Sequence, residues 1–224
     1  MRGCQEMPRQ ARAEATRRRI IDSAVELFAE LGYGETGLAD VLQRAGVSKG
    51  AFYYHFDSKE AIAAAIIDEY SRQIINAARE FFDPASPHME GIIRTTFRVA
   101  EIIETEPVAR VGNDLLQALS QISSISARVY REWSDAYLDI LTRTIGDWEP
   151  RDGVDPAEAA DAIWSSILGS HLLSSAGVED RYAQLARTWH FFLSALAPAD
   201  VRGELTKTLD EIAGGYPAAV GASR

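Results

Sequence analysis

The chain has 224 residues, of which 46% are hydrophobic and 25% are charged, and this composition excludes a disordered or collagen-like protein. No apolar run approaches the roughly 18 residues of a membrane span, and the Arg-rich first residues lack the apolar segment of a secretory signal. Because Cys4 is the single cysteine, an intrachain disulfide is excluded, and we expect a cytoplasmic protein.

The formal charge of −10 is spread unevenly along the chain. Residues 1–60 hold nine basic and nine acidic side chains, whereas residues 61–224 hold 14 basic and 24 acidic ones. This pattern favours a cationic arm on a neutral head, joined to an acidic body. Attraction to phosphate decays within a Debye length of about 8 Å at physiological salt, so a distant acidic body weakens DNA binding without preventing it.

Apolar residues recur at helical spacing almost everywhere, and the alternation typical of strands is absent. Gly32 and Gly34 are expected to end the first helix, and Asp57-Ser58 to cap the long one that follows the head. The helices expected in chain order span residues 11–31, 38–45, 48 onward, 58–82, 88–105, 107–119, 122–146, 156–175, 179–197 and 200–213.

The sequence therefore predicts an all-α protein with a small head and a larger body. We expect a disordered arm over 1–11, a three-helix DNA-binding head over 12–57, a helical ligand-binding and dimerisation body over 58–214, and a disordered tail over 215–224.

The head carries the features of a helix-turn-helix. Its two short helices need a tight turn, which Gly46 supplies, and apolar residues that lock them at a steep angle. These are Val41, Leu42, Ala45, Val47, Phe52 and Phe56. Small or polar residues at the start of the second helix suit entry into a major groove. They are Ser48, Lys49, Gly50 and Ala51.

The run Ala45-Gly-Val-Ser-x-Gly-x-Phe-Tyr-x-His-Phe-x-x-Lys-Glu60, after Leu27-Phe-Ala-Glu-Leu-Gly-Tyr33, resembles the signature of the tetracycline-repressor (TetR) family over residues 14–66. Two positions depart from it: Leu42 replaces a usual alanine, and Gly37 replaces a frequent Ser or Thr cap.

The resemblance implies roles for individual residues. The phosphate contacts it implies are Thr36, Tyr53, His55 and Lys59. The residues it places toward base edges are Ser48, Lys49, Gly50, Ala51 and Tyr54, with Lys49 the best direct reader because a lysine donates to guanine. The residues it implies near the DNA backbone or minor groove are Arg12, Thr16 and Arg17. The alternative for Arg17-Arg18-Arg19 is a solvated helix face.

A further likeness reaches into the body. Arg12-Ala-Glu-Ala-Thr-Arg17, Asp40-Val-Leu42 and Glu132-Trp133 are similar to the butyrolactone-autoregulator receptors of actinobacteria, which implies that Trp133 lines a ligand pocket. Such a pocket needs apolar walls and a few polar groups. The remaining ligand candidates are Tyr70, Asn113, Gln117, Tyr137, Trp164, Ser165 and Ser166. Ordinary core packing, or a polar face for Asn113 and Gln117, is the alternative.

The helices at 156–175 and 179–197 carry more apolar residues than one core requires, which predicts a homodimer through a four-helix bundle. These residues are Ile163, Ile167, Leu168, Leu172, Leu173, Leu185, Trp189, Phe192, Leu193 and Leu196. A two-fold dimer spaces two recognition helices about 34 Å apart, which predicts a palindromic double-stranded operator.

We therefore expect a repressor that a small amphipathic ligand, such as a butyrolactone, releases from DNA. A drug, a fatty acid or another apolar molecule is an alternative ligand, and an activator or a ligand-independent regulator is an alternative mode. An enzyme is the remote alternative, because the nucleophile elbow, the phosphate-binding glycine loop and the His-Glu-x-x-His motif are absent. We expect no catalytic residues, cofactor, metal or membrane partner; the four histidines are scattered: His55, His88, His171 and His190.

Overall fold

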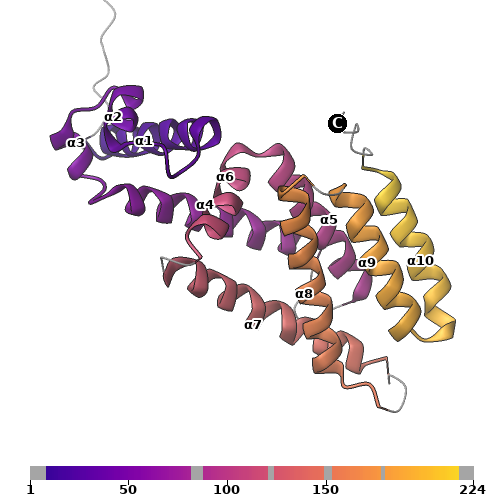
Figure 1. The fold of residues 1–224 in the computed structure, drawn as a ribbon. Coiled ribbons are helices and arrows are strands. Elements are labelled where there is room, and N and C mark those ends of the chain that lie inside the picture. Colours follow the sequence, from indigo (N-terminus) through magenta and orange to yellow (C-terminus); the bar gives the residue numbers. More distant parts are fainter. Residues whose placement is uncertain (1–8, 82–87, 121–123, 149–152, 178–179, 217–224) are drawn as a thin grey trace, which may run out of the picture. The chain divides into compact units, whose positions relative to one another are not determined.

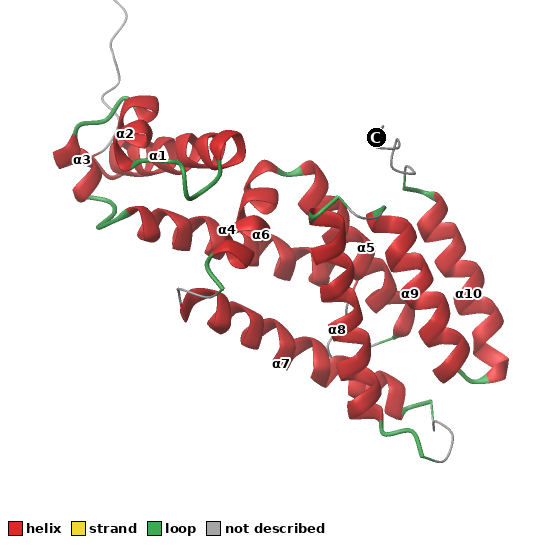
Figure 2. Ribbon diagram, viewed as in Figure 1, coloured by secondary structure: helices red, strands yellow, loops and turns green. Residues whose placement is uncertain are grey.

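The computed structural model describes residues 9–81, 88–120, 124–148, 153–177 and 180–216, which form ten α-helices (Figure 1). Helices and loops account for all of these residues (Figure 2), so the all-α prediction is confirmed. The helices are α1 (Arg9–Leu31), α2 (Leu38–Ala45), α3 (Lys49–Tyr53), α4 (Lys59–Phe81), α5 (Met89–Thr105), α6 (Pro107–Ala118), α7 (Ser124–Gly146), α8 (Pro156–Ser175), α9 (Arg181–Leu196) and α10 (Ala199–Gly214). Within the described ranges, none of them is both long and apolar enough to span a bilayer.

The helix ends follow local chemistry. Gly32 and Gly46 adopt left-handed backbone conformations, with φ of 84° and 63°, directly after α1 and α2. The Ser58 hydroxyl accepts the Ala61 amide at 3.2 Å, as the predicted cap of α4 requires. Gly37 offers no capping side chain, but its own amide donates to the Asp40 carboxylate at 2.9 Å.

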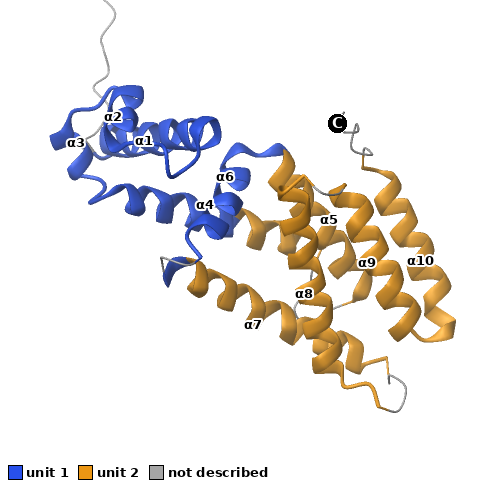
Figure 3. Cartoon of the chain, in the orientation of Figure 1, with its two compact units in different colours: residues 1–72, 105–125 blue, residues 73–104, 126–224 orange. Residues whose placement is uncertain are grey.

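The contacts divide the chain into two compact units (Figure 3). Unit 1 comprises residues 1–72 and 105–125, and therefore holds α1–α3, the first part of α4, and α6. Unit 2 comprises residues 73–104 and 126–224, and holds the rest of α4, α5, most of α7, and α8–α10. Helix α6, which the sequence placed in the body, thus belongs with α1–α3 by its contacts, and it packs on α1.

A glycine allows α6 to approach α4 closely inside unit 1. Gly112 is buried, and a Cβ added there would lie 2.5 Å from the Cβ and 2.9 Å from the Cγ of Tyr70. Tyr70 is itself only 2% exposed, so it has no room to retreat without repacking. The crossing of α4 and α6 at this point therefore requires the absence of a side chain.

The core of unit 2 contains several of the apolar residues of α8 and α9 from which the sequence predicts a dimer. Of these, Ile163, Ile167, Leu185, Trp189 and Leu193 are all at most 4% exposed and belong to one hydrophobic cluster. A single chain already buries these five side chains, so they belong to its core and do not form a dimer surface. Large apolar side chains that stay exposed on α8 and α9 are Leu172, Leu173 and Phe191.

The described chain continues past the predicted start of the tail at residue 215. The Tyr216 ring stacks on Tyr182 with centroids 4.5 Å apart, and lies 5.6 Å from the ring of Phe97. These contacts fix the end of α10 on α5 and α9. The remaining tail, 217–224, and most of the predicted arm, 1–8, lie outside the described residues.

The burial of His171 on α8 should lower the free energy of unfolding in mild acid. It is 8% exposed, and burial, aided by the Arg181 guanidinium 3.3 Å from its Nδ1, lowers its pKa to about 3. An unfolded histidine has a pKa near 6.5, so below that pH the unfolded chain takes up a proton that the folded chain refuses. Between pH 7 and pH 5 this should cost about 2 kcal/mol of the free energy of unfolding. Urea unfolding at both pH values should show a smaller loss for His171→Gln, and equal losses would contradict the assignment.

Candidate DNA-binding and ligand-binding sites

Helix α3 separates buried from exposed aromatic rings. Phe52 is 0% exposed and lies 6.1 Å from the buried Phe56 ring, so both hold α3 against the head, as predicted. Tyr53 and Tyr54 are 47% and 71% exposed. Because large apolar rings are rarely left in water without a partner, this face of α3 is a candidate contact surface.

Polar residues at the start of α3 extend the same surface. Ser48 caps the helix by accepting the Ala51 amide at 3.2 Å. Lys49 and Gly50 are exposed, and the Lys49 ammonium lies 5.9 Å from the centroid of the Tyr53 ring. His55 is half-buried, edge-on to Tyr54 at 4.9 Å. The flexible Lys49 cation and the Tyr53 phenol therefore lie side by side on the exposed surface of α3.

Two residues predicted to hold phosphates have internal partners. Thr36 is 1% exposed and its hydroxyl donates to Gly32 O at 2.8 Å, so a phosphate contact through this side chain does not fit the geometry. The Lys59 ammonium donates to Tyr33 O and Thr36 O, both at 2.8 Å, and lies 4.2 Å from the Tyr33 ring centroid. Since an ammonium has three donors, Lys59 keeps one N–H for a phosphate.

The first helix brings its cationic side chains to the same head. The Arg17 guanidinium lies 5.2 Å from the Phe56 ring centroid, which places this arginine beside the end of the helix-turn-helix. The Thr16 hydroxyl donates to Arg12 O at 2.9 Å within α1, and Arg12 is exposed. Arg18 differs from these, because its guanidinium is bound by the carboxylates of Asp22 and Glu69.

The eight predicted ligand residues fall into two groups. Tyr70, Asn113 and Gln117 belong to unit 1, where Tyr70 and Asn113 are buried and Gln117 is half-buried. The other five belong to unit 2 and come from α7 and α8: Trp133, Tyr137, Trp164, Ser165 and Ser166.

In unit 2 the aromatic residues form a polar–aromatic cluster with two unpredicted partners. The Tyr137 and Trp164 rings lie 5.0 Å apart, the Trp164 indole N–H donates to Ser134 Oγ at 2.8 Å, and the Tyr137 hydroxyl lies 3.4 Å from Thr96 Oγ1. Burial raises the pKa of Tyr137, so its phenol stays neutral at physiological pH. Trp133 is half-buried, edge-on to Tyr130.

The two serines contribute less to this cluster. Ser166 donates to Ala162 O at 2.7 Å within α8, and Ser165 is exposed. The structure therefore brings Tyr137 and Trp164 into contact, and leaves Ser166 bonded to its own helix.

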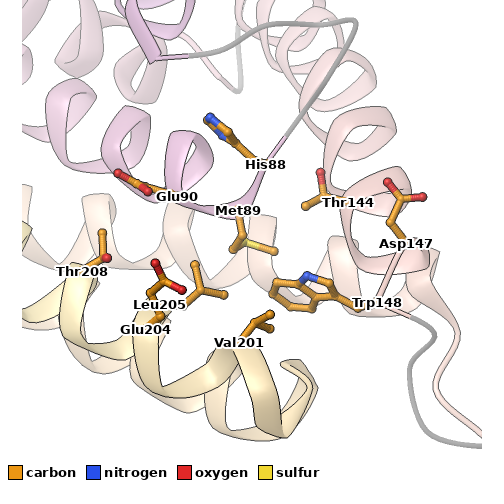
Figure 4. Close-up of a pocket in the computed structure, with 10 residues that line it drawn as sticks. All are labelled: His88, Met89, Glu90, Thr144, Asp147, Trp148, Val201, Glu204, Leu205 and Thr208. Atoms are coloured by element: carbon orange, nitrogen blue, oxygen red, sulfur yellow. The ribbon is translucent and has the colours of Figure 1, made fainter.

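A cavity of about 310 Å³ lies elsewhere in unit 2, between the start of α5, the end of α7 and α10 (Figure 4). Met89 lies in the middle of the lining residues and faces the Trp148 indole, with Val201 and Leu205 from α10 beside them (Figure 4). Half of its polar lining residues are acidic. This lining consists of His88, Glu90, Thr144, Asp147, Glu204 and Thr208. None of the eight predicted ligand residues lines this cavity.

The head matches a known family. A family model described as bacterial regulatory proteins, tetR family, matches residues 20–66. The A-factor receptor protein of Streptomyces griseus is 33% identical over 193 residues, which cover 85% of this chain and 67% of that protein. The chain belongs to the TetR family of bacterial regulatory proteins. The relatives found are regulators and receptors, and the TetR-family chain is a transcriptional regulator, not an enzyme.

Solved structures of TetR regulators resemble this TetR-family chain over most of its length. A gamma-butyrolactone receptor (ArpA-like protein) has a TM-score of 0.72 at 26% identity, covering 92% of this chain and 100% of that chain. CprB from Streptomyces coelicolor, solved in complex with its biological operator sequence, has a TM-score of 0.71 at 27% identity with the same coverage.

Sequence reasoning missed the residues that partner the aromatic side chains of this TetR-family body. Ser134 directly follows Trp133 and lies about one turn before Tyr137, but it was not singled out. Thr96 lies on α5, far away in the sequence. Thr96 is 4% exposed and interrupts an otherwise apolar helix face. A buried hydroxyl in such a face was the available signal, because buried polar groups need partners.

Proposed function

We propose that this TetR-family chain forms a homodimer, represses transcription by binding a palindromic operator, and leaves the operator when a small amphipathic ligand of the γ-butyrolactone class binds in the body. The observation that carries the proposal is the surface of α3, where Lys49, Tyr53 and Tyr54 point outward while Phe52 anchors the helix from below. Since the operator is chromosomal, the protein acts in the cytoplasm.

On the DNA side, base edges are read from the start of α3 and phosphates are held by its end and by α1. Lys49 is assigned to base edges, with Ser48, Gly50, Ala51 and Tyr54 around it. Tyr53, His55 and the remaining donor of Lys59 are assigned to phosphates, and Arg12, Thr16 and Arg17 to the adjacent backbone. Phosphate contacts fix the register, while base contacts supply sequence preference.

On the ligand side, Trp133, Tyr137 and Trp164 are assigned to an apolar wall with polar tips. The neutral Tyr137 phenol can donate to a lactone carbonyl, and the rings can cover an alkyl chain. The names of relatives in the comparison support this class of ligand, since they include an A-factor receptor and a gamma-butyrolactone receptor.

For the dimer, α8 and α9 are assigned as the interface. Leu172 and Phe191 are 56% and 67% exposed, which is unusual for side chains of this size, and Leu173, the residue after Leu172, is 39% exposed. A two-fold dimer carries two copies of α3, which matches the two half-sites of a palindromic operator.

Helix α4 provides the connection between ligand and DNA, because one continuous helix contributes residues to both units. Loss of register at the operator needs only a few kcal/mol, since each 1.4 kcal/mol changes an affinity tenfold. The coupling must also be reciprocal: a ligand that weakens operator binding binds less tightly to the operator complex.

A mobility-shift assay with the DNA upstream of the protein's own gene tests the proposal, with random duplex as the competitor and γ-butyrolactones as added ligands. We expect an inverted repeat to be retained at moderate salt and released by ligand. No preference for an inverted repeat would refute the DNA assignment, and tight ligand binding without release would refute the coupling.

Tyr53 should contribute to binding of every DNA sequence. Loss of a hydrogen bond to a charged phosphate costs about 1.5–3 kcal/mol, so Tyr53→Ala should weaken binding by roughly tenfold to a hundredfold. Tyr53→Phe is the matched variant, because it keeps the ring beside Lys49 and removes the hydroxyl alone. Titrations against the inverted repeat and random duplex should show parallel losses. Normal binding by Tyr53→Ala would mean that α3 is not the recognition helix.

Trp133→Ala should separate ligand response from DNA binding. We expect unchanged operator affinity in the absence of ligand. Release should require about tenfold more γ-butyrolactone, since an indole ring covered by the ligand contributes about 1.4 kcal/mol to its binding. Trp148→Ala, at the acidic cavity, is the control and should respond like the wild type. If Trp148→Ala needs more ligand for release and Trp133→Ala does not, the ligand binds in that cavity and not beside Trp133.

A further inference from the structure

Arg18 is the middle residue of the Arg17-Arg18-Arg19 run, and its side chain lies between two helices of unit 1. Its Nη1 lies 2.8 Å from Glu69 Oε1 on α4, and its Nε lies 2.8 Å from Asp22 Oδ1 on α1 itself. The pair with Glu69 joins residues 51 positions apart, so it is a tertiary contact. Arg18 is therefore occupied by carboxylates in the free protein.

The two partners of Arg18 differ in their exposure to water. The Glu69 side chain is 20% exposed, whereas the Asp22 side chain is 48% exposed. Because the Glu69 side chain is mostly shielded from water, its carboxylate loses much of its hydration. Without Arg18, the negative charge of Glu69 would lack the cation that offsets this loss. Asp22 on α1 is solvated with or without the arginine. The contact with Glu69 is thus the one that favours a particular placement of α1 on α4.

The next residue along α4 meets the third helix of this junction. Tyr70 lies against Gly112 of α6, and α6 in turn packs on α1. Two consecutive residues of α4 therefore contact α1 and α6. A displacement of α4 at this point acts on α1 through the ion pair and on α6 through the tyrosine.

We propose that the Arg18–Glu69 ion pair is a positioning contact that holds α1 on α4 in the DNA-binding arrangement of the head, and that Arg18 acts on operator affinity through Glu69 and not through DNA. The proposal rests on the proposed operator binding. Arg18 then neither contacts a phosphate nor simply lies on a solvated helix face, which are the two roles considered from the sequence.

This role predicts that one substitution changes operator affinity in the direction opposite to the one expected from charge alone. Glu69→Gln removes a negative charge, which by electrostatics alone strengthens binding to DNA. If the ion pair positions α1, the same change should weaken operator binding, by about tenfold. Asp22→Asn is the matched control, since it removes the other carboxylate partner of Arg18 and the same charge but leaves the link to α4. It should bind the operator as tightly as the wild type or more tightly.

The experiment is a double-mutant cycle with Arg18→Gln, Glu69→Gln and both, measured as affinity for the inverted-repeat duplex in the full-length protein at several salt concentrations. We expect each single variant to lose about tenfold and the double variant to lose no more than either one. The dependence of affinity on salt should keep the wild-type slope in all of them, because no phosphate contact is removed. Thermal unfolding checks that each variant is folded, and the swapped pair Arg18→Glu with Glu69→Arg should recover affinity.

Two results would overturn the inference while the proposed function stands. One is wild-type or tighter operator binding by Glu69→Gln. The other is a reduced salt slope in Arg18→Gln, which would mean that Arg18 contacts phosphate directly. If the wild-type protein itself shows no preference for an inverted repeat, the proposed function and this inference both fail.

Discussion

Replacing Leu172 and Phe191 by glutamate is expected to convert the dimer into a monomer and to abolish tight binding to an inverted repeat. The two side chains are 56% and 67% exposed in the single chain, so the change should leave the fold of the body intact. At the proposed interface, however, each glutamate would be an unpaired buried charge. Because a dimer engages two half-sites at once, losing the second should reduce operator affinity by on the order of a hundredfold or more.

Sedimentation or light scattering measures the oligomeric state of this double variant, and a mobility shift measures its operator affinity. Ile75→Glu is the matched control: it introduces the same charge at an apolar residue that is 42% exposed, but on α4. It should remain dimeric and bind the operator. A dimeric Leu172→Glu, Phe191→Glu protein would show that the subunits associate through another surface.

Phe52→Ala should unfold the DNA-binding head. The ring is 0% exposed and lies between Tyr53, edge-on at 5.3 Å, and Phe56, so its removal leaves a cavity that the short helices cannot close. The expected cost is about 3–5 kcal/mol, a large part of the stability of a small domain. Operator binding should be lost at any ligand concentration.

Hydrogen exchange locates this effect. Amides of α2 and α3 should lose protection in Phe52→Ala, while those of α8 and α9 keep it and the protein stays dimeric. Phe52→Leu is the control, since it keeps most of the volume and should cost less than about 1.5 kcal/mol. If α8 and α9 lose protection equally in the alanine variant, the two units do not unfold separately.

The helices were predictable because their signals are local. Ser48, Gly46 and Ser58 act within a few residues of themselves, and the observed bounds of α2 and α8 agree with those predicted. The packing of the helices within the body was harder to predict from the sequence. The apolar stripes on α8 and α9 identify buried faces, but they do not show whether a face meets the same chain or a second copy. Trp189, for example, was compatible with either, and the structure buries it in the core of its own chain.

The DNA-binding face was likewise predictable where a motif fixes it. The separation of Phe52 from Tyr53 and Tyr54 follows from helical geometry. The positions of the Lys59 and Arg18 side chains could not be predicted in this way, because each is decided by a partner distant in the chain: Tyr33 O for Lys59 and the Glu69 carboxylate for Arg18. The sequence shows which polar side chains a motif contains, but it does not show which of them already form hydrogen bonds or ion pairs within the folded chain.

The crossing of α4 and α6 has a consequence for engineering this protein as a biosensor. Libraries that retune effector preference commonly vary whole helix faces, and α6 carries Asn113 and Gln117 among the ligand candidates. Position 112 should be kept invariant in such libraries, because even alanine would collide with Tyr70. Variants substituted at position 112 would misplace α6 and show no response to the ligand, even where their ligand-binding residues suit the molecule tested.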